Sequence, residues 1–391
     1  MQVLTNARPA SLPQSGLAHI TVRVSAAGPQ PLTRTIVKAA KLQQDSARFQ
    51  QDGNLSEAEA RCRVALDLVE QEQGPASADA ANILHSLGEI LCRRRKFAEA
   101  EACAHRAAII IEYLLPQLEG PEGMQILIAS LALLGTALRE QGRYAEAEAP
   151  VVRAIQLGRG LPNLTGALIE ALNEYGVLCK VAGWFENGEI VYRRAFELAL
   201  KLHGGNSETM ATLLHNLGAL YHAAGRFNDA EEHARRGLQI RRSLLGDVHS
   251  DVLSDAVAYG AILDSLGRFG ESRPIYERAV AEYTLRFGPE NYEMAVTLHH
   301  LAGVERAQGN MRKAEKLANR ALVLKQKILG VQHPDTAFSA MHLGFILSEA
   351  GREEEARALF TSALAIFERT LAQGHPNVTK CRKLLADEKK S

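Results

Sequence analysis

Histidine is the residue type in this chain best suited to bind a metal, and the sequence holds 13 of them. His215 and His222 fall two turns apart on a predicted helix, a rise of about 10 Å, which is too far for both to bind one ion. His299, His300 and His342 occupy equivalent positions in adjacent repeats (described below), but no cysteine or carboxylate accompanies them at ligand spacing. We therefore predict no metal site, and we interpret these histidines as polar groups lining a surface.

The usual local signatures of catalysis are missing from the sequence. It has no GxxxxGK[ST], no GxGxxG after a predicted strand, no HExxH and no GxSxG. The pair Gly204-Gly205 resembles an oxyanion loop, but it falls in a connector between repeats, where glycine serves to turn the chain. We expect neither a cofactor nor an enzymatic activity. An enzyme would need a site assembled across repeats without a local motif.

Cysteine usage and charge set further limits. Five scattered cysteines without a CxxC pair indicate a reduced, cytoplasmic protein and no disulfide or zinc framework. Lys and Arg total 45 and so do Asp and Glu, so net charge indicates no nucleic-acid or membrane partner. No apolar run approaches the length of a membrane span. The cysteines are predicted to be core residues, with Cys92 the candidate for a surface position: Cys62, Cys92, Cys103, Cys179 and Cys381.

The elements that would position these residues come from an internal repeat. A turn residue recurs at steps of 42, 47, 41, 42, 42, 42 and 42 residues. A Gly or Ala preceded by Leu or Tyr stands seven residues before nearly every turn, as in Leu217-Gly218, and small residues stand five and twelve after it. Small residues let two antiparallel helices approach closely, and no single pair can bury its apolar faces alone. The pattern predicts an all-α, right-handed superhelical solenoid of eight helix pairs, with turns at Gly53, Arg95, Gly142, Gly183, Gly225, Gly267, Gly309 and Gly351.

These columns resemble the tetratricopeptide repeat, which has a Leu-Gly in its first helix, an aromatic residue at the turn and two alanines in its second helix. The longer 42-residue period and the connector LGVQHPDT at Leu329–Thr336 are similar to the kinesin light chain class of that family. The resemblance covers about residues 36 to 388. It implies a concave groove, lined by the first helix of each pair, in which a peptide or partner protein binds.

The resemblance implies groove positions two, three and six residues before the Leu-Gly glycine and one, four and five after it. Carrying these positions onto this chain gives a set of candidate binding residues. The residues that stand four positions after the Leu-Gly glycine of each repeat include three permanent cations and a histidine. The resemblance implies an acidic peptide as the ligand of this cationic column. The amides of Asn173 and Asn216 can both donate to and accept from a peptide backbone. Glu170, Glu174 and Asp264 lie on the same surface, and the Lys–Asn clamp of chaperone-tail binders is absent. The candidates are Arg139, Lys180, His222, Arg306, Asn173, Asn216, His215, His299, His300 and His342.

The ends of the chain differ from the repeats. Residues 1–34 carry four prolines and no acidic residue, so we predict a flexible tail, although His19–Ser25 alternates like a strand. The solenoid is predicted over residues 35–375, with an irregular piece at Pro116–Gly123, and a capping helix and tail over 376–391. The leading functional hypothesis is a non-enzymatic adaptor that binds a peptide or partner protein. The alternative is a regulatory or sensor subunit of a separately encoded enzyme or effector. Nothing in the sequence indicates an oligomeric state.

Overall fold

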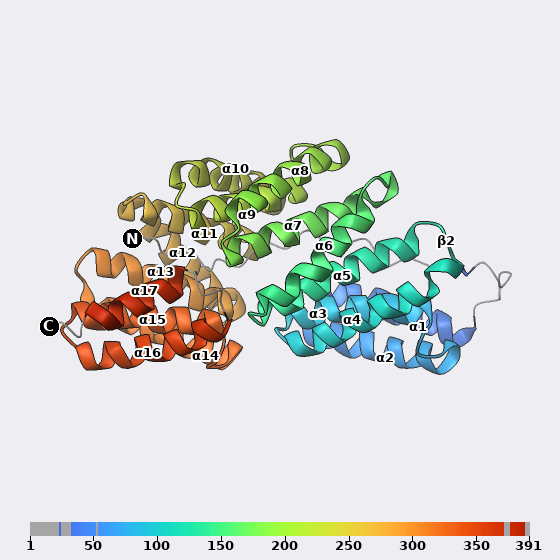
Figure 1. Cartoon of the computed structure of the whole chain (residues 1–391), viewed down its shortest axis with the longest axis horizontal. Helices are drawn as coiled ribbons and strands as arrows, with labels where there is room; N and C mark the ends of the chain where they lie inside the picture. Colours follow the sequence, from blue (N-terminus) through green and yellow to red (C-terminus); the bar gives the residue numbers. More distant parts are fainter. Residues whose placement is uncertain (1–22, 25–32, 52–53, 371–375, 388–391) are drawn as a thin grey trace. The chain divides into compact units, whose positions relative to one another are not determined.

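The computed structural model describes residues 23–24, 33–51, 54–370 and 376–387. Contacts divide these residues into two units. The N-terminal unit runs to Leu178 and includes Glu197–Leu202, and the C-terminal unit holds Cys179–Phe196 and everything from His203 onward. Within each unit, helices follow one another as antiparallel pairs, shown in chain order by the colours of Figure 1.

The helices match the predicted repeat, with odd-numbered first helices and even-numbered second helices. In the N-terminal unit they are α1 (Arg34–Gln51), α2 (Leu55–Gln73), α3 (Ala78–Arg93), α4 (Phe97–Leu114), α5 (Glu122–Glu140), α6 (Tyr144–Gly158) and α7 (Thr165–Ala182), the last turn of which belongs to the C-terminal unit. The C-terminal unit continues with α8 (Phe185–His203), of which Glu197–Leu202 belong to the N-terminal unit. It then holds α9 (Glu208–Ala223), α10 (Phe227–Leu245), α11 (Ser250–Ser265), α12 (Phe269–Phe287), α13 (Tyr292–Ala307), α14 (Met311–Leu329), α15 (Pro334–Glu349), α16 (Glu353–Thr370) and α17 (Pro376–Asp387). The predicted all-α repeat solenoid is confirmed.

The predicted turn positions adopt the left-handed conformation that ends the first helix of a pair. All seven that lie within the described residues have positive φ, for example 79° at Gly225; the eighth, Gly53, lies outside them. Arg95, with φ of 60°, is the only described non-glycine residue with positive φ. An L side chain adopts this conformation at a cost of about 1 kcal/mol. The repeat geometry therefore holds even where glycine is missing.

Close backbone approach explains the columns of small residues. A Cβ atom built on Gly218 of α9 would lie 3.2 Å from the carbonyl oxygen of Ala230 and 3.2 Å from the amide nitrogen of Ala234, both on α10. Ala230 is fully buried. Because the two backbones touch at this level, neighbouring large side chains fill the space around the contact.

Two of the connectors begin the next first helix with a histidine cap. His333 Nδ1 accepts from the backbone N–H of Asp335 at 3.1 Å, and His249 Nδ1 accepts from Asp251 at 3.2 Å. Gly330 ends α14 with φ of 86°, as its place in the connector predicts. The histidine of the LGxxHPxT connector thus satisfies an otherwise unpaired N–H at the start of a helix.

The segment predicted to be irregular forms a short 3₁₀ turn at Leu115–Gln117 followed by strand β2, Leu118–Glu119. Strand β1, Arg23–Val24, pairs with it antiparallel, with Arg23 opposite Glu119 and Val24 opposite Leu118. These two residues belong to the stretch predicted to alternate like a strand; its other residues, and residues 1–22 in general, lie outside the described part. A second 3₁₀ turn, Pro162–Leu164, precedes α7.

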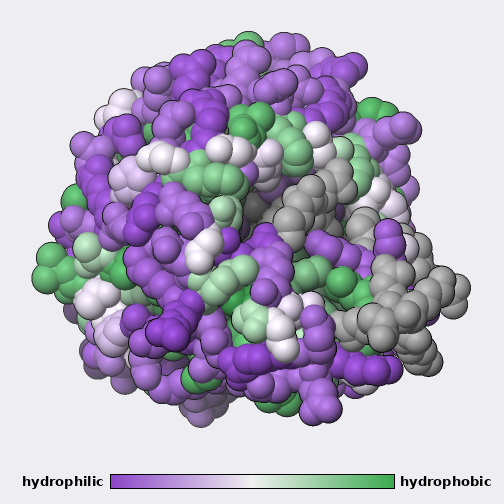
Figure 2. Space-filling model, turned by 90° about the vertical axis from the view of Figure 1, so that its left-hand side faces the viewer, coloured by the Kyte–Doolittle hydropathy of each residue, from purple (hydrophilic) through white to green (hydrophobic). Residues whose placement is uncertain are grey.

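The last helix covers the end of the C-terminal unit. Val378 and Cys381 on α17 are fully buried in the same cluster as Phe360 and Phe367 of α16. None of the described helices has the length and hydrophobicity needed to cross a membrane. The face seen in Figure 2 is mainly hydrophilic, and its apolar patches are small and separate from one another.

Candidate functional site

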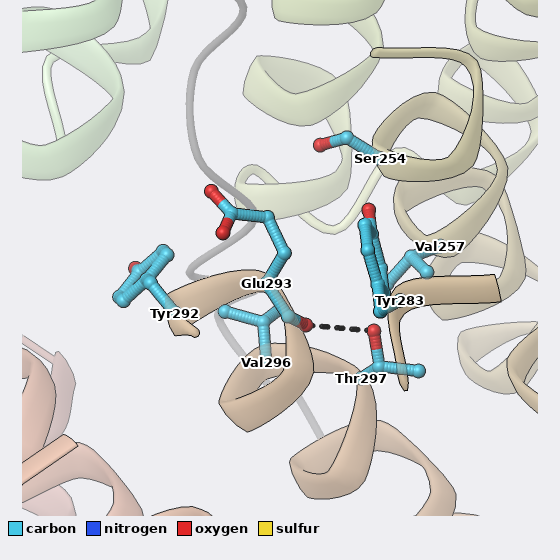
Figure 3. Close-up of a pocket in the computed structure, with 7 residues that line it drawn as sticks. All are labelled: Ser254, Val257, Tyr283, Tyr292, Glu293, Val296 and Thr297. Atoms are coloured by element: carbon cyan, nitrogen blue, oxygen red, sulfur yellow. Dashed lines mark hydrogen bonds between the residues drawn. The ribbon is translucent and has the colours of Figure 1, made fainter. Parts of the chain in front are cut away.

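A hollow opens between α11, α12 and α13 of the C-terminal unit, with about 260 Å³ of space that includes open solvent (Figure 3). Its apolar walls are Val257 and Val296, which come from consecutive first helices. These residues precede the repeat's small residue by three and six positions, and both columns are groove positions in the sequence-based assignment. The full lining is Ser254, Val257, Tyr283, Tyr292, Glu293, Val296 and Thr297.

The polar groups of the hollow are divided between internal bonds and its rim. Thr297 donates to the backbone carbonyl of Glu293 at 2.8 Å, and the Tyr292 hydroxyl donates to Asp335 at 2.7 Å. The Ser254 side chain and the Glu293 carboxylate lie on the same side of the hollow, above Val296 and Thr297 in Figure 3. The hollow is thus apolar at its base and polar at one side. Sequence reasoning placed Val257 in a groove column but did not select it, because a valine gives no chemical signal.

Three of the predicted histidines come together in the C-terminal unit but are buried. The rings of His299 and His342 lie 4.1 Å apart between centroids, and His300 stacks on Tyr276 at 5.6 Å. Burial lowers the pKa of His300 and of His342 to about 3, and that of His299 well below its usual value. They are therefore neutral core groups at pH 7, which corrects the expectation of polar groups lining an open surface. Among the described residues, no three His, Cys, Asp or Glu are placed to hold a metal ion.

His215 belongs to a buried charge cluster that links three helices. Its Nδ1 lies 2.8 Å from Asp255 Oδ1, and Arg241 Nε donates to the other carboxylate oxygen at 2.7 Å. Arg241 also donates to Thr212 at 2.9 Å. Burial alone would raise the pKa of Asp255, but His215 and Arg241 together hold it below its usual value. Since the cluster joins α9, α10 and α11, His215 connects consecutive repeats.

The cationic column is also engaged within the chain. Arg139 on α5 donates to Glu174 on α7 at 2.6 Å and to Glu140 at 2.6 Å. Arg306 on α13 pairs with Glu349 on α15. The prediction that this column faces an acidic ligand did not anticipate the pairs with Glu174 and Glu349, because these partners come from the neighbouring repeat.

The remaining predicted site residues are buried as well. His222 is within 2.7 Å of the Ser265 hydroxyl, and burial lowers its pKa to about 4. Asn173, Lys180 and Asn216 are each less than 9% exposed. The structure therefore brings the predicted residues onto first helices, as expected, but packs them between repeats.

The described cysteines are free thiols, three of them buried and Cys92 and Cys103 partly buried. Burial raises the pKa of Cys62 to about 12 and that of Cys103 to about 11. The pKa of Cys92 is raised for the same reason. A thiol with a raised pKa is a poor nucleophile at neutral pH, which fits the interpretation of these cysteines as packing residues.

The buried histidines predict that acid destabilises the C-terminal unit. A histidine with a lowered folded pKa contributes stability above its unfolded pKa of about 6.5, and this is lost as the pH falls toward the folded value. Between pH 7 and pH 5, His342 alone should account for a loss of about 2 kcal/mol. Urea unfolding followed by Trp184, the single tryptophan, measures this in the wild type and in His342→Gln, in which the pH dependence should shrink by that amount.

The exposed His203 on α8 provides the control, because His203→Gln should leave the pH dependence unchanged. A His342→Gln variant with the wild-type pH dependence would show that His342 has the same pKa in the folded and unfolded states.

Comparison with known proteins agrees with this architecture. A family model described as tetratricopeptide repeat matches residues 167–243, 209–284, 252–325 and 293–369, which together exceed half of the chain. A second model with the same description matches residues 80–115 and 127–160. No curated protein matches the chain in sequence.

Several solved structures are similar in fold at low sequence identity. The apo form of the quorum sensor NprR from B. thuringiensis is 12% identical, with a TM-score of 0.59 over 86% of this chain and 89% of that one. The Rap conjugation gene regulator of plasmid pLS20, solved with the Phr* peptide, is 12% identical, with a TM-score of 0.58 over 86% and 98%. BtubC (BKLC) from P. vanneervenii is 23% identical, with a TM-score of 0.44 over 61% and 93%.

Proposed function

The chain belongs to the tetratricopeptide repeat family, and on this premise we propose that it is a non-enzymatic interaction module that holds a peptide, or an extended segment of a partner protein, against its first helices. The observation that carries the proposal is the hollow between α11 and α13, which is built from two groove columns of consecutive repeats. Solved structures of this fold include the Rap conjugation gene regulator of plasmid pLS20 in complex with the Phr* peptide. That supports the class of ligand.

The size and chemistry of the hollow favour a side chain over a cofactor. Pockets for small-molecule ligands usually measure about 300 to 1,000 Å³. The space of about 260 Å³ here includes open solvent, so the enclosed part of the hollow is much smaller than such a pocket. Its walls, Val257 and Val296, offer apolar contact, while Ser254 and Glu293 provide polar groups at one side. Such a hollow suits one anchoring side chain of an extended peptide whose other residues contact neighbouring repeats.

The preference for acidic ligand side chains stays a prediction from the sequence. Arg139 and Arg306 are held by glutamates of the next repeat. Lys180, on the last turn of α7, is 8% exposed.

A matched pair of serine variants tests the proposal. Peptides selected from a random dodecapeptide display library on the full chain should bind at least about tenfold more weakly to Ser254→Arg, because the new side chain fills the hollow. Ser243→Arg adds the same group at an exposed position of α10 and should leave affinity unchanged. Fluorescence anisotropy with the selected peptides gives both values. Equal binding to wild type and Ser254→Arg would contradict this placement of the ligand.

The regulatory alternative makes a separate prediction. If the chain controls a separately encoded effector, adding a selected peptide should change the activity of the co-purifying partner. An adaptor would instead keep both bound without a change in that activity.

A further inference from the structure

The hollow between α11 and α13 lies where one column of the repeat changes its residue type. Tyr283 on α12 lines the hollow and is 2% exposed. The residues 42 positions before and after it are Arg241 on α10 and Lys325 on α14, and both are buried as deeply. The repeats on either side of the hollow therefore bury a cation in this column, whereas the repeat at the hollow has a tyrosine there.

Each of the two buried cations is held by a carboxylate of the next first helix. Arg241 Nε donates to Asp255 Oδ2 at 2.7 Å, and Lys325 Nζ donates to Asp335 Oδ1 at 3.0 Å. Burial alone would raise the pKa of Asp335, but Lys325 is the foremost of the groups that hold it below its usual value. Glu293 stands 42 residues before Asp335. The repeat at the hollow thus keeps the carboxylate of this arrangement and has no cation in the column that supplies one to Asp335.

Three oxygen-bearing side chains gather on one side of the hollow. In Figure 3 the Ser254 hydroxyl, the Tyr283 hydroxyl and the Glu293 carboxylate all lie above the two valines, Val257 and Val296. A carboxylate has about four lone-pair sites, so Glu293, which also interacts elsewhere in the chain, can still accept donors from a ligand. The hollow therefore combines an apolar base with a group of oxygen acceptors.

From this geometry we infer that the hollow binds a lysine side chain of the ligand, whose ammonium takes the position that Arg241 and Lys325 occupy in the neighbouring repeats. The inference rests on the proposed peptide-binding function and names one residue of the ligand. A lysine lays its methylene stem along apolar surface and keeps its charged head among polar groups, and Val257 and Val296 provide that surface here. Its ammonium has three N–H donors, one for each of the oxygen-bearing side chains.

Other side chains fit the hollow less well. A carboxylate of the ligand would meet the Glu293 carboxylate, and like charges placed together weaken binding. An aliphatic side chain would contact the two valines but bring no donor to the oxygens. An arginine carries a planar fork of five donors, which needs more room than a compact ammonium, and the enclosed part of the hollow is small. We therefore expect lysine in preference to arginine.

Peptides that differ only in the charged head test the inference. Dodecapeptides are selected by display on the full chain, and those with a shared lysine are synthesised with lysine, arginine or norleucine at that place. Norleucine keeps an aliphatic stem but has no ammonium. By fluorescence anisotropy, we expect the norleucine form to bind the wild type at least about tenfold more weakly than the lysine form. The arginine form should also bind more weakly than the lysine form.

Two variants change the hollow itself. Tyr283→Lys introduces the kind of cation that the neighbouring repeats carry, and it should weaken binding of the lysine peptides at least about tenfold, because the chain's own ammonium fills the site. Glu293→Gln keeps the shape of the side chain but removes its charge, and it should abolish the difference between the lysine and norleucine forms. Glu277→Gln, on α12 with its side chain about half exposed, is the matched control and should preserve that difference.

The outcomes separate this inference from the proposed function. If Ser254→Arg weakens binding but the lysine form binds no more tightly than the norleucine or arginine form, peptide binding in the hollow stands and the lysine site is overturned. A difference between the lysine and norleucine forms that survives in Glu293→Gln, unchanged binding to Tyr283→Lys, or selection without a shared lysine overturns it too. If Ser254→Arg leaves the binding of every selected peptide unchanged, the proposed placement of the ligand fails, and the lysine site fails with it.

Discussion

Asp255→Ala is expected to lower the free energy of unfolding by about 3 to 5 kcal/mol, because it leaves Arg241 as a buried charge without its partner. Arg241 and Asp255 are each 3% exposed, and their atoms approach to 2.7 Å. His215 would lose its carboxylate partner at the same time. The cluster joins three consecutive helices, so the loss should destabilise the packing of α11 against α9 and α10.

Urea unfolding of the full chain, followed by Trp184 fluorescence, measures this loss. Asp247→Ala is the matched control, because Asp247 pairs with Arg242 at the surface, where both side chains are about half exposed. An exposed pair contributes at most about 1 kcal/mol. A loss below that value for Asp255→Ala would mean that water reaches the cluster and that it does not hold the repeats together.

Gly218→Leu should destabilise the C-terminal unit by about 3 kcal/mol or more, through overpacking between α9 and α10. The first added carbon would lie 3.2 Å from the Ala230 carbonyl oxygen and 3.2 Å from Ala234 nitrogen. Both contacts are backbone atoms of a buried helix and cannot rotate away. The helices would have to separate, which would open the contact on which the whole repeat depends.

The control for this substitution is a helical glycine with space around it. A Cβ on Gly270 in α12 would meet nothing within 4 Å. Gly270→Leu should therefore be neutral or stabilise by up to about 1 kcal/mol through helix propensity. Similar unfolding curves for Gly218→Leu and Gly270→Leu would contradict the account of close backbone packing.

The fold was predictable because its determinants repeat in the sequence. Gly225 forms the turn of its helix pair, and Gly218 allows the close approach of the two helices. Because equivalent residues recur in the other pairs, the columns identify the helix pairs without any long-range information. Arg95 adopts the left-handed conformation at a position where the other described repeats have glycine. The position in the repeat therefore determines this backbone conformation more than the residue type does. The sequence indicated a strand around Arg23 and Val24 but not the segment with which it pairs, which is β2.

The site was predictable only in part. The columns place Arg139 and His215 on first helices correctly, but they carry no information on rotamers. Whether Arg139 faces a ligand or Glu174 depends on side-chain geometry between repeats, which a column cannot specify. The hollow beside Val257 was missed because its walls are ordinary aliphatic residues, whose type does not indicate a binding site.

Mapping the contact of a selected peptide on the folded chain tests the central claim most directly. A peptide carrying a benzophenone in place of one of its side chains is crosslinked to the wild-type chain by light, and mass spectrometry identifies the attached residues. The account predicts attachment to first helices, above all α11 and α13 around Ser254 and Val296. Attachment confined to the second helices α10, α12, α14 and α16 would contradict it.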